Sequence, residues 1–213
     1  MEKIKGLLCM TAAFCLCLSS VAFASGINST NSNRVPKYKA PGTVLKFDKN
    51  KEITVIKQGD VDKNINTSKY TPTSDLPEIT ADMTVIYDAL GGPVISISKE
   101  QAKLEVSMNE VNPNAKVSSI ASNTQTGEIS WFDIWAEPDT ASGQKAADGA
   151  AHRNIAFFTR VAVVNNAVPA WNTSVRILDR GPYVTGRILD MSKESFYYCE
   201  YLEKGVFNGT ITW

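Results

Sequence analysis

One acidic side chain stands where a predicted strand ends. Asp179 follows residues 173–178, in which Val175 and Ile177 alternate with their neighbours as in a half-buried strand. The run breaks at Gly181-Pro182, where the backbone must turn. A strand fixes the position of such an acid and the loop leaves its side chain accessible, so Asp179 is a candidate for proton transfer. The alternative is that it only accepts hydrogen bonds from the amides of the turn.

Histidine and cysteine are too few for most metal chemistry. His152 is the only histidine of the chain, and Cys199 is the only one of four cysteines outside residues 1–24. One histidine and one cysteine disfavour a zinc site, and a single thiol cannot form an intramolecular disulfide. We therefore expect no metal and no cofactor, and we expect Cys199 to be a buried free thiol in a monomer.

The first 24 residues have the features of a secretory signal peptide. Lys3 and Lys5 precede an apolar run over residues 7–18, and small residues stand near Ala24. The apolar run is short for a bilayer span, so the mature chain is predicted to be secreted without a transmembrane segment. Cleavage removes two of the 22 basic and one of the 22 acidic residues, leaving a net charge of −1. Such a balance gives no electrostatic reason to bind nucleic acid.

The rest of the chain divides into four predicted parts. Residues 25–41 and 111–126 are rich in polar residues and turn formers and are interpreted as linkers, the first one disordered. Residues 42–110 contain two hairpin patterns and predict a small β-rich extension in which we identify no chemistry. Residues 127–213 contain several short strands and a helix that begins after Ser192. The pattern predicts a mainly β chain ending in a small closed barrel with one short helix.

Six short motifs in this last part resemble a known family. They are Ser130-Trp-Phe132, Thr140-Ala-Ser-Gly-Gln144, Ala150-Ala-His-Arg153, Thr159-Arg-Val-Ala-Val163, Asp179-Arg-Gly-Pro-Tyr183 and Gly186-Arg-Ile-Leu-Asp-Met-Ser192. In order and spacing they resemble the rare lipoprotein A-like double-psi β-barrel of septal-ring lytic transglycosylases, and more distantly expansins and family 45 endoglucanases. The resemblance implies a six-stranded barrel with a groove for a glycan strand, and a protein associated with the cell wall that acts on peptidoglycan.

The resemblance also assigns roles to individual residues. It implies that Asp179 is the catalytic acid of the groove and that His152 lies beside it as a second, supporting catalytic residue. The family has a glutamate where this chain has Gln144, which we interpret as a substrate contact together with Thr140. Two aromatic residues in loops, Trp135 and Tyr183, are candidates for stacking on sugar rings.

The replacement of glutamate by Gln144 leaves several functions open. Hydrolysis with inversion needs two carboxyl groups, and an amide cannot exchange a proton. Lytic transglycosylation can proceed with one carboxyl group, because the sugar's own 6-hydroxyl attacks and the same group can act as acid and then as base. We therefore predict a lytic transglycosylase that uses Asp179. The alternatives are an expansin-like module that binds or loosens the wall without catalysis, and a protease inhibitor built on the same barrel.

Overall fold

The computed structural model describes residues 33–60, 73, 75–96, 123–136 and 140–213. The predicted signal peptide lies outside these residues. Residues 33–213 fall in one compact unit, which holds both a small sheet and a barrel. The part of the chain that the structure describes contains no helix with the length and hydropathy of a membrane-spanning segment.

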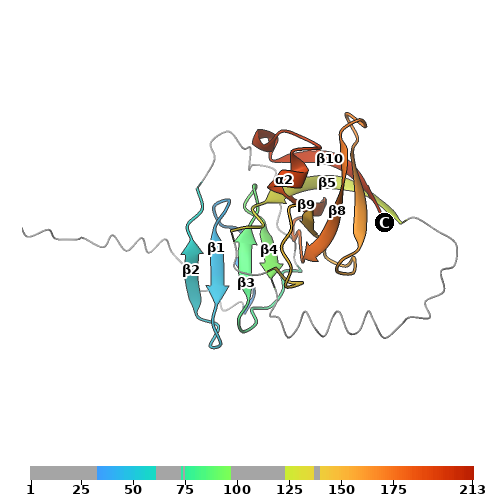
Figure 1. Ribbon diagram of the computed structural model, residues 1–213. Coiled ribbons are helices and arrows are strands. Elements are labelled where there is room, and N and C mark those ends of the chain that lie inside the picture. The colour runs from blue at the N-terminus through green and yellow to red at the C-terminus, as the bar shows by residue number, and fades with distance from the viewer. Residues whose placement is uncertain (1–32, 61–72, 74, 97–122, 137–139) are drawn as a thin grey trace, which may run out of the picture. The chain divides into compact units, whose positions relative to one another are not determined.

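The extension forms a four-stranded antiparallel sheet, and both predicted hairpins are present (Figure 1). Its order is β2-β1-β3-β4. The strands are β1 (Val44–Phe47), β2 (Ile53–Lys57), β3 (Thr84–Tyr87) and β4 (Pro93–Ser96). Part of the predicted linker is ordered beside this sheet, because Val35 is buried against its core and donates a backbone hydrogen bond to Pro77.

The C-terminal part is a closed barrel of six strands, as predicted. Its order is β10-β5-β9-β6-β8-β7, and β10 closes on β7. The strands are β5 (Thr124–Phe132), β6 (Gly149–Ala151), β7 (Arg160–Asn165), β8 (Asn172–Asp179), β9 (Arg187–Ser192) and β10 (Val206–Thr212). The pairs β5–β9 and β6–β8 are parallel, and the other neighbours are antiparallel. Strand β5 begins three residues before the predicted start of the barrel.

The helical region after β9 is shorter than its sequence pattern suggests. Ser192 caps α2 (Lys193–Phe196), since its hydroxyl accepts a hydrogen bond from the Ser195 amide at 3.2 Å. A 3-10 helix, η2 (Leu202–Lys204), then ends at Gly205, which adopts a left-handed conformation with a φ of 69°. The predicted helix start after Ser192 is confirmed, but the residues from Ser192 to Gly205 do not form one continuous helix.

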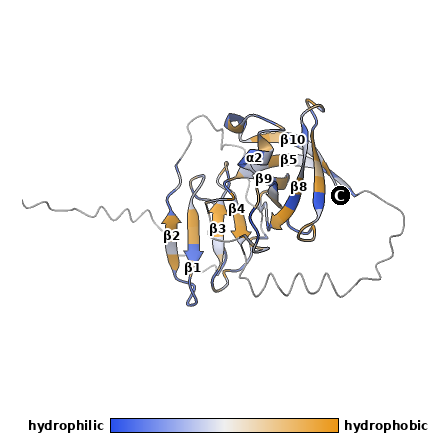
Figure 2. Ribbon diagram, viewed as in Figure 1, coloured by the Kyte–Doolittle hydropathy of each residue, from blue (hydrophilic) through white to orange (hydrophobic). Residues whose placement is uncertain are grey.

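The three largest clusters of buried apolar side chains lie inside the barrel and on the two opposite faces of the extension sheet. The barrel core includes Ile129, Val163, Ile177 and Leu189. One face of the extension sheet carries Leu45, Val85, Tyr87 and Ile95. The other face contributes Val44, Ile86 and Val94 to a cluster shared with Phe132, Ile134, Ala151 and Leu178 of the barrel. Figure 2 shows hydrophobic residues within β3 and β4, which are buried on both faces.

Candidate functional site

A transverse row of residues crosses four neighbouring strands of the barrel. Ser130 of β5 pairs with Asp190 of β9, Asp190 pairs with Ala151 of β6, and Ala151 pairs with Asp179 of β8. Residues paired in this way project to the same face of a sheet. The Cα atoms of the two acids are therefore roughly 10 Å apart, the width of two strand spacings. We call Ser130, Asp190, Ala151 and Asp179 the carboxyl row.

A register shift in β8 brings Asp179 into this row. Ala150 pairs with Ile177, but the next residue, Ala151, pairs with Asp179, so Leu178 is one residue in excess. Such a bulge turns two successive side chains to the same side of the sheet. Leu178 accordingly packs in the cluster shared with the extension sheet, while Ile177 lies in the barrel core.

The side chain of Asp179 is fully buried. Its Oδ1 accepts a hydrogen bond from the backbone N–H of Ala141 at 2.5 Å. The Ser142 amide donates to the Leu178 carbonyl at 2.9 Å, so the loop of residues 140–144 closes against the end of β8. The sequence had suggested an accessible acid at a turn. The structure instead places this acid under a loop that arrives from a distant part of the chain.

The two polar residues predicted in this loop have different environments. Thr140 is buried, and its hydroxyl donates to the Gln144 carbonyl, which stabilises the loop. The Gln144 side chain is exposed and makes no hydrogen bond to any residue that the structure describes. A ligand can therefore reach the Gln144 amide, whereas Thr140 has a structural contact.

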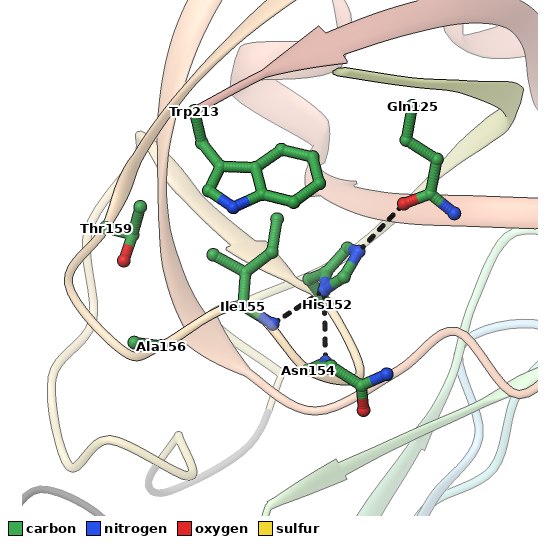
Figure 3. Close-up of a pocket in the computed structure, with 7 residues that line it drawn as sticks. All are labelled: Gln125, His152, Asn154, Ile155, Ala156, Thr159 and Trp213. Carbon is green, nitrogen blue, oxygen red and sulfur yellow. Dashed lines mark hydrogen bonds between the residues drawn. The ribbon is translucent and has the colours of Figure 1, made fainter. Parts of the chain in front are cut away.

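His152 is a neutral histidine with a defined tautomer. Its Nδ1 accepts hydrogen bonds from the amides of Asn154 at 3.1 Å and Ile155 at 2.9 Å. The ring hydrogen is therefore on Nε2, which donates to Gln125 Oε1 at 3.3 Å (Figure 3). Burial, and then the positive charges of Arg180 and Arg153, lower the pKa of His152 to about 4. His152 is uncharged at neutral pH, and its bonds tie the loop that follows β6.

The His152 ring lines an open pocket of about 370 Å³. Figure 3 shows it with the six other lining residues, which are Gln125, Asn154, Ile155, Ala156, Thr159 and Trp213. The Trp213 ring lies 5.9 Å from the His152 ring, centroid to centroid. Asp179 does not line this pocket, although its carbonyl accepts the His152 amide at 3.2 Å. The two predicted catalytic residues are thus neighbours through the backbone, while their side chains have separate surroundings.

The two aromatic candidates, Trp135 and Tyr183, have different surroundings. Trp135 is 50% exposed, and its indole N–H donates to Glu194 at 3.0 Å. Tyr183 is half-buried against the apolar cluster of the extension sheet that contains Leu45 and Val85. The Arg153 guanidinium lies 5.6 Å from the centre of the Tyr183 ring. Trp135 is open to a ligand, whereas one side of Tyr183 is occupied by protein.

Asp190 is the member of the row that our sequence analysis missed. It is fully buried, and its Oδ1 accepts a hydrogen bond from the Ser130 hydroxyl, while its Oδ2 has no hydrogen-bond partner among the described residues. Burial, and then the charge of Asp88, raise the pKa of Asp190 to about 7, against the opposing effect of Arg187. The alternation of side chains along β9 could have indicated this acid. Leu189 and Met191 point into the barrel core, so Asp190 between them must face outward.

A buried arginine joins the row to the extension. The Arg187 guanidinium donates to the Asp88 carboxylate and lies 3.7 Å from Asp190. The other Asp88 oxygen accepts the amides of Leu90 at 2.7 Å and Gly92 at 2.9 Å. Burial raises the pKa of Asp88 as well, but Asp88 has more donors than Asp190, so the negative charge belongs on Asp88 and the proton on Asp190. Among the residues described, no group of three or more histidines, cysteines or acids is placed to hold a metal ion.

These features define a six-stranded barrel protein with two acids on one outer face. Residues 124–211 match the protein family described as lytic transglycolase. This part of the chain is therefore a double-psi β-barrel of the lytic transglycosylase-like family, and the predicted resemblance is confirmed. The match does not include the extension sheet. The search of curated proteins found no match for this chain.

Proposed function

We propose that this protein is secreted and that its barrel cleaves peptidoglycan glycan strands by lytic transglycosylation, with Asp179 as acid and base. The observation that carries the proposal is the carboxyl row, which holds Asp179 and Asp190 on one face of a barrel of the lytic transglycosylase-like family. The predicted signal peptide supports an extracytoplasmic, cell-wall location.

The reaction needs one proton to move and consumes no water. The O6 atom of a muramic acid residue bonds to C1 of the same sugar, and the bond from C1 to the leaving oxygen breaks. Asp179 starts in its acid form and donates its proton to the leaving oxygen as that bond breaks, and its carboxylate then accepts the O6 proton, which returns Asp179 to its starting state. Asp190 is a second acid on the same face, and burial raises its pKa to about 7. Gln144 cannot take either role and is left to contact the sugar.

The role of His152 in this scheme is to position Asp179. The ring is neutral at pH 7, and both of its nitrogens are already used in hydrogen bonds. Its backbone amide is bonded to the Asp179 carbonyl, so the loop that His152 ties supports the end of β8. The predicted contribution of His152 to the reaction is therefore indirect.

Mass spectrometry of glycan products tests the proposal. Purified glycan strands are incubated for long times with the wild type or with Asp179→Asn, beside a known lytic enzyme as positive control. We expect 1,6-anhydro-muramyl ends from the wild type and none from the variant. Equal yields from the two proteins, or no such ends under any condition in which the control enzyme makes them, would overturn the proposal.

A second candidate function is glycan binding without cleavage, in the manner of expansins. Two observations favour it, namely that Asp179 is fully buried and that the exposed residue of the loop is an amide, Gln144. The open pocket beside His152 and Trp213 offers an aromatic face and amide groups for a sugar. This function predicts that the protein co-sediments with sacculi, releases no soluble product, and binds equally well after Asp179→Asn.

A further inference from the structure

The carboxyl row lies on the outside of the barrel wall and yet is closed to solvent. Ser130, Asp179 and Asp190 each have 0% of their surface exposed. The inward-facing neighbours Ile129, Leu189 and Met191 fill the barrel core, so the row faces away from that core. An outer face with two acids and a hydroxyl would ordinarily be wet.

The extension sheet supplies apolar contacts over this outer face. Val44, Ile86 and Val94 from β1, β3 and β4 form one cluster with Phe132, Ala151 and Leu178 of the barrel. Ala151 is itself a member of the row. The apolar cluster therefore reaches the position between the two acids.

Strand β4 also binds the barrel through its backbone. The Ile95 amide donates to the Arg180 carbonyl at 2.8 Å, and the Arg180 amide donates to the Ile95 carbonyl at 3.4 Å. A Cβ atom added to Gly181 would lie 3.4 Å from the Cα of Val94, so the two chains are in close contact. These contacts begin at the residue that follows Asp179.

Ionic groups connect the same two surfaces. Arg187, beside the row, binds Asp88 of the extension and also lies near Asp190. Burying charged groups costs free energy, and a permanently covered surface is often no less stable when it is apolar. This face instead keeps two acids, a serine and an arginine under an apolar sheet. Such polar groups are expected on a surface that binds a ligand or reacts with it when the sheet is absent.

We infer that the β1–β4 sheet is an autoinhibitory cover, which occupies the glycan-facing surface of the barrel and must separate from it before a glycan strand reaches Asp179 and Asp190. This inference rests on the proposed function for its consequence, the control of cleavage. The cover itself predicts that Asp179 and Asp190 are inaccessible to solvent, and this accessibility can be measured without an activity assay.

Two valines of the sheet provide matched variants for this measurement. Val94 faces the barrel and Val85 faces the other way, and both are almost completely buried on neighbouring, paired strands. Val94→Ala and Val85→Ala remove the same atoms from the sheet, but only Val94→Ala weakens its contact with the barrel. Loss of such contacts shifts an opening equilibrium about tenfold or more.

Carboxyl footprinting of the full mature chain reads out the accessibility of each acid. After reaction with a carbodiimide and an amine, trypsin releases residues 177–180, 188–193 and 52–57, which carry Asp179, Asp190 and the exposed Glu52 as their only side-chain carboxyls. We expect Asp179 and Asp190 to be protected in the wild type and in Val85→Ala relative to Glu52. In Val94→Ala we expect both to react about tenfold faster, with a parallel rise in 1,6-anhydro ends.

The outcomes separate the two claims. Wild-type Asp179 and Asp190 that react as fast as Glu52 would overturn the cover, whatever the activity. Equal reactivity in Val85→Ala and Val94→Ala would also overturn it, because exposure would then follow unfolding of the sheet. Exposed acids in Val94→Ala without any anhydro ends would uphold the cover and contradict the proposed function.

Discussion

Asp179 and Asp190 flank Ala151 from its two neighbouring strands, so two buried acids occupy one transverse row of the barrel. Their surroundings differ. Asp179 accepts a hydrogen bond from the Ala141 amide, whereas Asp190 shares a buried network with Ser130, Arg187 and Asp88. Each environment has consequences that can be tested by substitution.

Asp190 makes folding stability fall as the pH rises. Burial raises its pKa from 3.8 to about 7, so between these values the folded chain keeps a proton that the unfolded chain has lost. The free energy of unfolding should fall by about 1 kcal/mol per pH unit from this group, and Asp190→Asn should remove that contribution. Urea unfolding at several pH values between 4 and 7 measures the slope.

His152 has the opposite effect. Its pKa falls from 6.5 to about 4, so between these values the unfolded chain binds a proton that the folded chain excludes, and stability drops as the pH is lowered. In the wild type the two slopes oppose each other. We expect stability to rise with pH in Asp190→Asn and to fall with pH in His152→Gln. Slopes of the same sign in the two variants would refute these assignments.

Replacement of Gln144 by alanine should have a modest effect on cleavage. The side chain is exposed and cannot transfer a proton, so its loss removes at most one hydrogen bond to the sugar. We expect the rate of anhydro-end formation to fall by no more than about tenfold. Gln144→Glu is the matched control, since it places a carboxyl group of nearly the same size at the same position. A loss in Gln144→Ala as complete as that in Asp179→Asn would show that Gln144 takes part in the chemistry.

The pocket beside His152 should contribute to glycan binding through Trp213. Trp213→Ala removes the aromatic face of that pocket, and stacking interactions of this size are worth about 1 kcal/mol. We expect roughly fivefold weaker binding to purified glycan strands, measured by titration. Trp171→Ala is the control, because Trp171 lines a different pocket beside Tyr201. Equal losses in the two variants would argue against a specific role for the His152 pocket.

Cys199 should be unreactive in the folded protein. It is a fully buried free cysteine, and burial raises the pKa of its thiol to about 11. A thiol reagent added to the mature chain should modify no cysteine until denaturant is present, and should then modify one thiol per chain. Rapid reaction without denaturant would contradict the burial of this side chain.

Local patterns in the sequence predicted most of the strands but not the arrangement of the site. Alternation and turn residues identified both hairpins and β8, whereas β6 contains only Gly149, Ala150 and Ala151 and has no apolar period to detect. The row depends on that short strand, because its middle residue pairs with both acids. Register between distant strands, and burial by a separate sheet, arise from contacts that no local pattern encodes.

In the proposed mechanism, Asp179 acts on glycan strands at a surface that the extension sheet covers. The most direct measurement is the rate of 1,6-anhydro-end formation by the wild type, Val94→Ala, Asp179→Asn and the double variant. We expect Val94→Ala to be faster than the wild type and both proteins with Asp179→Asn to be inactive. A double variant as active as Val94→Ala would show that Asp179 does not carry out the cleavage.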